Sequence, residues 1–171
     1  MELIETVTVG SGGQSSIEFT SIAADWTDLY LVLSARSSRS GTGDNGYMGF
    51  NGSTSDFSNR SFLGYGSTVE SASVARLFGI VNGNTSTTNT FTNIGIYIPN
   101  YASSVSKSFS TEATAENNAT LGYLMFGGNL WNNTAAISSI ELSLVFGSFL
   151  EHSSASLYGI ASGSDGTTTV A

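Results

Sequence analysis

The side chains able to carry acid–base or nucleophilic chemistry are few in this chain. It contains a single histidine, His152, and no cysteine. Histidine can take the proton of a serine hydroxyl near neutral pH, and Glu151 and several serines lie beside it. No Gly-x-Ser-x-Gly sequence lies in a strand-to-helix setting, however, and serine is too common to single out a nucleophile. We therefore expect His152 to be a solvated turn residue and assign no catalytic residue.

Pairs of carboxylates are the second kind of candidate. Glycoside hydrolysis needs two carboxyl groups about 5 to 10 Å apart, and the sequence offers Glu112 with Glu116, or Asp25 with Asp28. Both pairs fall in segments that we expect to be turns, outside any recognisable framework. A β-sandwich glycanase is therefore the least favoured function class, and we expect that the protein is not an enzyme.

Two glycine-rich segments resemble ligand loops only weakly. The run Gly41–Gly46, GTGDNG, offers Asp44 and Asn45 to a calcium ion, but it lacks the further oxygen ligands and closing glutamate of an EF-hand. The run Gly10–Gly13, GSGG, lacks the lysine and the strand-to-helix context of a phosphate loop. We expect both runs to be turns, with no metal site and no cofactor.

Arginine and tryptophan are the candidates for a contact with another macromolecule. Four of the five basic residues are arginines in the first half of the chain, namely Arg36, Arg39, Arg60 and Arg76. The planar guanidinium pairs with carboxylates and stacks on aromatic rings, so these are candidate interface residues, although surface solubility alone also explains each of them. Trp131, at the end of an apolar run, is a candidate anchor in the core or at the interface.

A second interpretation of the aromatic residues is glycan binding. An exposed aromatic ring beside an amide can stack on a sugar ring while the amide bonds its hydroxyl groups. Tyr65, Trp131 and Asn132 are the candidates for such a contact.

Composition and charge restrict the partners. The 13 acidic and 5 basic residues give a net charge of −8, which repels phosphate backbones and anionic membranes, so we expect neither nucleic acid nor membrane as a partner. Only 11% of the residues are charged, and the surface must consist largely of short polar side chains. Because such side chains lose little conformational entropy when covered, this surface suits a lasting contact.

Hydrophobic periodicity predicts strands throughout. Apolar and polar residues alternate in Thr90–Pro99, which is typical of a strand with one buried face. The segment Asp28–Arg36 contains a continuous apolar run, which is typical of a strand buried on both sides. About eight to ten such segments, separated by turn-forming residues, predict an all-β, antiparallel, jelly-roll-like β-sandwich. We expect one domain over residues 1–160 and a Gly/Ser/Thr-rich tail or arm over residues 161–171.

The segment Ile137–Ile160 is the one around which we expect the sandwich to close. Ile140 and Leu142 alternate with polar residues, and a second alternating run ends at Ile160. The polar residues Gly147–Ser154 lie between the two runs. The pattern predicts a hairpin of two strands.

Several phrases of the sequence resemble small β-rich virion proteins of tailed bacteriophages. The phrases are MELIETVTVGSGGQSSIEFTSI, TDLYLVLSARSSRS, NTFTNIGIYIPNYASS, TEATAENNATLGY and LWNNTAAISSIELSLVFGSFLEHSSASLYGI. The closing SLYGI also resembles the ends of tail-fibre proteins.

This resemblance implies a non-enzymatic structural protein. The chain is similar to capsid decoration, or cement, proteins. These proteins bind the major capsid protein on the outer surface of the virion, often as homotrimers. On that basis the two terminal segments, residues 1–13 and 161–171, are expected to order against a capsid subunit or a neighbouring copy. The alternative is a tail-associated or receptor-binding lectin-like domain that contacts host surface glycan.

Overall fold

Buried and exposed side chains alternate along the strands of this molecule, and the strand β9 (Lys107–Ala115) is a clear example. The computed structural model describes residues 1–119 and 121–161. In β9 the side chains of Phe109 and Ala113 are buried, whereas those of Ser110 and Glu112 are exposed. The strands are β1 (Glu2–Thr8), β2 (Ser16–Phe19), β3 (Asp28–Ala35), β4 (Gly43–Phe50), β5 (Phe57–Tyr65), β6 (Thr68–Ala72), β7 (Leu77–Asn82), β8 (Thr92–Ile98), β9 (Lys107–Ala115), β10 (Tyr123–Trp131), β11 (Ile140–Leu144) and β12 (Ser154–Ile160). Among the described residues there is no helix that is long and apolar enough to cross a membrane.

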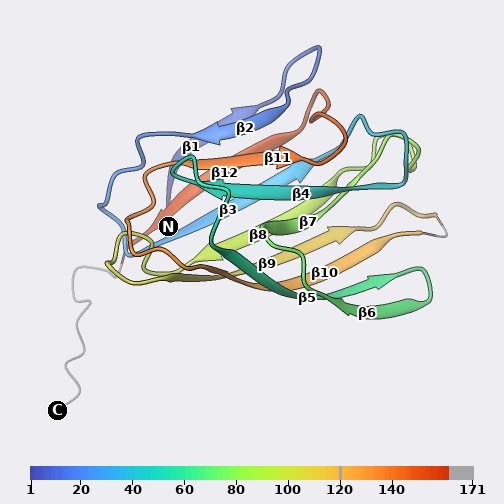
Figure 1. The fold of residues 1–171 in the computed structure, drawn as a ribbon. Coiled ribbons are helices and arrows are strands. Elements are labelled where there is room, and N and C mark those ends of the chain that lie inside the picture. Colours follow the sequence, from blue (N-terminus) through green and yellow to red (C-terminus); the bar gives the residue numbers. More distant parts are fainter. Residues whose placement is uncertain (120, 162–171) are drawn as a thin grey trace.

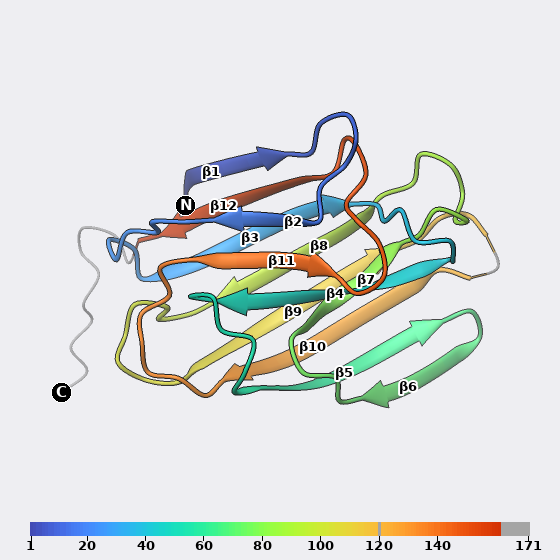
Figure 2. The same cartoon turned by 45° about the horizontal axis from the view of Figure 1, so that its top comes forward.

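The strands form two facing antiparallel sheets, which confirms the predicted all-β sandwich. The large sheet has the order β1-β12-β3-β8-β9-β10-β5-β6, and the small sheet has the order β2-β11-β4-β7. Figure 1 shows the small sheet lying over the large one, and Figure 2 shows the large sheet spread from β1 to β6.

The connectivity is that of a jelly roll. Four antiparallel pairs are nested in the sequence, β1 with β12, β2 with β11, β3 with β8 and β4 with β7, and they alternate between the large and the small sheet. This is the strand order of two interlocked Greek keys. The other four strands are insertions: β5 and β6 follow β4, β9 and β10 follow β8, and all four widen the large sheet. They bring the total above the eight to ten strands expected.

The expected hairpin over Ile137–Ile160 was wrong. The segment does contain two strands, but β11 lies between β2 and β4 in the small sheet, whereas β12 lies between β1 and β3 in the large sheet. The connection begins against the small sheet and then crosses to the large sheet. The backbone N–H groups of Phe146 and Gly147 both donate to the buried Asp44 carboxylate of β4.

The core lies between the sheets and includes a cluster of aromatic rings. The Trp131 ring lies 5.4 Å from that of Phe50 and 6.1 Å from that of Phe57, and Phe109 completes the cluster. Trp131, at the end of β10, packs on the neighbouring strand β5 in its own sheet and on β4 across the sandwich. Of the expected tail, residues 162–171 lie outside the described residues.

Candidate binding surface

The surface with most potential for binding is the outer face of the large sheet, which is the face turned away from the small sheet. Strand register places its side chains in rows that run across the strands. One row consists of Val32, Gly95, Glu112, Phe126 and Phe62, since each residue of this series pairs with the next. Neighbouring strands are about 4.8 Å apart, so adjacent members of a row can touch the same ligand.

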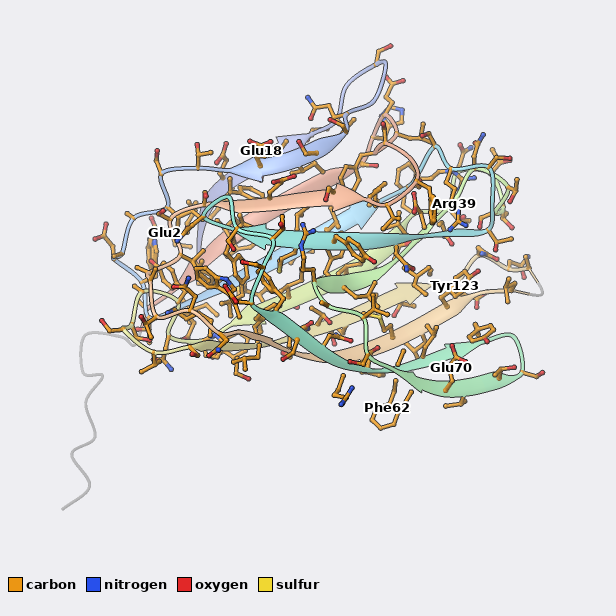
Figure 3. The ribbon with its side chains drawn as sticks, viewed as in Figure 1. Glu2, Glu18, Arg39, Phe62, Glu70 and Tyr123 are labelled. Atoms are coloured by element: carbon orange, nitrogen blue, oxygen red, sulfur yellow. The ribbon has the colours of Figure 1, made fainter. Side chains whose placement is uncertain are left out.

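Exposed apolar side chains gather at the β6 end of this face. Phe62, Val69, Leu124 and Phe126, which we call the apolar patch, are 68%, 79%, 46% and 54% exposed. Phe126 pairs with Phe62, and Gly64 lies between Leu124 and Val69 in the register. Figure 3 shows the Phe62 side chain projecting away from the sandwich. A contiguous apolar patch on a protein surface is typical of an interaction site.

Three tyrosines occupy adjacent strands in the middle of the outer face. Tyr158 of β12 pairs with Tyr30 of β3, which pairs with Tyr97 of β8. The Tyr97 hydroxyl donates to the Asp28 carboxylate over 2.7 Å, and this carboxylate also accepts the backbone N–H of Asn100. The orientation of the Tyr97 ring is therefore set by a hydrogen bond.

A hollow of about 280 Å³ opens next to the tyrosines, over Gly95. Tyr30, Tyr97, Ser110, Glu112 and Phe126 are among its lining residues. Burial, followed by the nearby Glu112 carboxylate, raises the pKa of the Tyr30 hydroxyl. The hollow therefore contains the hydroxyl of Tyr30, a hydrogen-bond donor, beside the oxygen acceptors of Glu112.

The Arg36 side chain is buried, so it is not available to a partner in this structure. Its guanidinium donates to the backbone carbonyls of Asn84, Ser86, Thr87 and Thr90. Burial lowers the pKa of this guanidinium. Arg36 therefore holds the loop between β7 and β8 onto the sandwich, and its candidacy as an interface residue is corrected.

The other three arginines differ in exposure. Arg39 is half-buried, donates to the carbonyl of Gly43 and lies 4.2 Å from the centre of the exposed Phe146 ring. Arg76 is also half-buried, and its side chain donates to the carbonyl of Met48 over 2.7 Å. Arg60 is exposed on the outer face opposite Gly128, next to the row that contains Phe126 and Phe62.

The three residues expected to contact glycan do not form one site. Trp131 is 1% exposed and belongs to the core, so its ring cannot stack on a sugar. Tyr65 pairs with Tyr123 at one end of β10, and Asn132 follows the other end. Nine residues of strand separate the two positions, which is about 30 Å. Tyr65 also donates to Glu70, and Asn132 accepts the hydroxyl of Ser106.

The residues considered for catalysis or metal binding occupy ordinary structural positions. Asp44 is fully buried in β4 and accepts the Ser37 hydroxyl over 2.7 Å, in addition to the two backbone N–H groups of the β11–β12 connection. His152 is exposed in a turn with φ 72°. Glu112 lies in β9 and not in the expected turn. Within residues 1–119 and 121–161, no three His, Cys, Asp or Glu side chains gather in a group that could hold a metal ion.

Sequence reasoning missed the hollow at Gly95. The alternation in Thr90–Pro99 does place Gly95 and Tyr97 on the face opposite to the isoleucines. It contains no information on which strands pair with this one, so Tyr30, Glu112 and Phe126 were not recognised as neighbours.

Comparison of the chain with protein-family models, with curated proteins and with solved structures gave no match. Function is therefore inferred from the surface of this chain and from the resemblance of its sequence phrases.

Proposed function

We propose that this chain is a non-enzymatic structural protein of a tailed-bacteriophage virion, most specifically a capsid decoration protein. In this proposal it binds the major capsid protein on the outer surface and bridges neighbouring subunits as a homotrimer. The observation that carries the proposal is the apolar patch, which gives a compact β-domain an exposed contact surface.

The patch has the properties of a surface that is covered in an assembly. Its four side chains are large and apolar, and β6, which carries Val69, is the terminal strand of the large sheet in the described part of the chain. A terminal strand has backbone groups free to pair, and proteins usually protect such strands. The β6 segment has one charged residue, Glu70, among five. A subunit seated here gains apolar burial and backbone hydrogen bonds together.

Binding of this kind stabilises a shell by mass action. A protein that binds the assembled shell and not the free subunits lowers the free energy of the assembled state. Short polar side chains such as Ser58, Ser108 and Ser110 on the same face lose little entropy when covered. The virion setting itself comes from the resemblance of the sequence phrases to phage virion proteins.

The proposal is tested by locating the protein on the particle. Purified virions of the phage that encodes this chain are labelled with gold-conjugated antibody and viewed by electron microscopy. Label distributed over the heads is expected. Label only on the tails would refute the decoration role and support the tail-associated alternative, and particles without label would refute both.

A further inference from the structure

We propose that the hollow over Gly95 is a binding site for a neutral sugar ring, such as a hexose unit of a surface polysaccharide. This site differs from the expected set of Tyr65, Trp131 and Asn132. It goes beyond the proposed structural role. Phe126 belongs both to the hollow and to the apolar patch, so the sugar site is tested on the free protein.

The floor of the hollow exists because residue 95 is glycine. Gly95 occupies an outward position of β8, yet it is buried because neighbouring side chains close over it. A Cβ atom at this position would lie 2.6 Å from the Tyr30 hydroxyl oxygen and 2.9 Å from Glu112 Oε1. Both contacts are closer than normal van der Waals distances. Any side chain at residue 95 would therefore displace the two polar atoms from the floor.

The floor and the walls have the chemistry that a sugar requires. A sugar ring has apolar C–H faces and a rim of hydroxyl groups that both donate and accept. The Phe126 and Tyr97 rings, 54% and 38% exposed, offer apolar surface to the C–H faces. The two oxygens of Glu112 can accept from hydroxyl groups of the sugar, and the hydroxyls of Tyr30 and Ser110 supply further polar groups of the lining.

The charge of the site favours a neutral sugar over an acidic one. Glu112 is the charged group of the hollow, and the chain has a net charge of −8. A sulfate, phosphate or carboxylate on the ligand would lie against this carboxylate and be repelled. The outward residues beside the hollow, including Ser156, Asn93 and Thr114, are short and polar. A polymer can therefore extend across the sheet on either side of the bound unit.

The first test is a glycan array that carries neutral hexose oligosaccharides together with sulfated and uronic-acid oligosaccharides. The best neutral ligand is then titrated by calorimetry and by NMR. Binding of neutral oligosaccharides is expected, with amide shifts centred on Gly95, Ser110 and Glu112. Binding to acidic glycans only, no binding to any glycan, or shifts centred elsewhere on the chain would each overturn the proposal.

The second test compares two glycine variants on the same face. Gly95→Ala places a methyl group in the floor of the hollow, whereas Gly128→Ala adds the same group where no atom lies within 4 Å. We expect Gly95→Ala to weaken binding at least about tenfold, because it displaces the polar atoms that bond the sugar, and Gly128→Ala to bind like the parent chain. Equal affinity of the two variants would contradict the assignment.

Two tyrosine variants test the site independently of Gly95→Ala, which would also lose affinity if it misfolded. Tyr97→Ala removes an exposed ring of the hollow, and Tyr158→Ala removes a tyrosine of the same row that does not line it. Only Tyr97→Ala is expected to lose affinity for the sugar. Circular dichroism is expected to show that both variants are folded. The gold-labelling result on virions is independent of these affinities, so failure of the sugar site and failure of the decoration role are distinguishable.

Discussion

Two buried charged side chains fasten loops to this sandwich. Arg36 donates to four backbone carbonyls of the loop between β7 and β8, and Asp44 accepts two backbone N–H groups from the connection between β11 and β12. Hydrogen bonds to charged groups are stronger than neutral ones, about 1.5 to 3 kcal/mol each. These two loops are therefore positioned by Arg36, which directly follows β3, and by Asp44 of β4.

Replacement of Arg36 by leucine tests this anchoring. Arg36→Leu leaves the carbonyls of the loop without their donor, and we expect the free energy of unfolding to fall by about 3 kcal/mol. Urea denaturation measures the change. Arg60→Leu is the matched control, because Arg60 is exposed and its replacement should change the free energy by less than about 0.5 kcal/mol. Similar losses in the two variants would contradict the role of Arg36.

Tyr101 predicts a dependence of stability on alkaline pH. Burial raises the pKa of its hydroxyl above the usual value of 10.0, and the hydroxyl donates to the carbonyl of Ala23. Because the folded state holds this proton more tightly, the associated stability is fully present below pH 10 and is lost as pH rises through the raised pKa. Urea unfolding at a series of alkaline pH values should give a shallower loss for Tyr101→Phe than for the parent chain. Equal slopes would contradict the prediction.

At the scale of elements, β5, β6 and β10 determine the contact surface. Residues of the apolar patch lie on all three strands, and the cross-strand register brings them together. The β5–β6 hairpin lies at the end of the large sheet, beyond β7 of the small sheet (Figure 2). The outward side chains of this hairpin, including Phe62 and Val69, are exposed, as the proposed contact requires.

The double variant Phe62→Ser, Val69→Ser tests the apolar patch. It removes two exposed apolar side chains, each worth about 1.5 kcal/mol when buried by a partner, so binding to particles that lack the protein should weaken at least about tenfold. Co-sedimentation with such particles measures the binding. Val105→Ser is the control, because Val105 is 57% exposed and lies outside the patch, between β8 and β9. Unchanged binding by the double variant would refute the role of the patch.

At the scale of the whole molecule, the jelly roll joins segments that are far apart in the chain. Thr6 of β1 and Ser156 of β12 share a hydrogen bond across 150 positions of sequence. Such contacts form late, because the intervening chain must first lose the entropy of a long loop. The last strand completes the large sheet between β1 and β3.

This topology predicts slow folding. Refolding from urea should take milliseconds to seconds, the range typical of proteins dominated by non-local strand pairing. Stopped-flow fluorescence can follow the reaction, since Trp131 moves from water into the aromatic core. Refolding on the microsecond scale would contradict this prediction.

The sequence by itself determined the local character of the chain. Alternation in Thr90–Pro99 and the two alternating runs of Ile137–Ile160 identified strands, and their number and spacing predicted the jelly-roll-like sandwich. These predictions held because the period of side-chain exposure is a property of each strand alone.

Only the tertiary structure decided which strands pair and which residues become neighbours. Alternation of apolar and polar residues identifies the buried face of a strand but not the strand that pairs with it. The sequence therefore predicts one hairpin for β11 and β12, although they lie in different sheets. For the same reason the pattern left Trp131 open between the core, an interface and a glycan contact, and made Arg36 an interface candidate, whereas both are buried. The hollow at Gly95 is made by β3, β8, β9 and β10, and only long-range register, a property of the folded chain, brings these strands together.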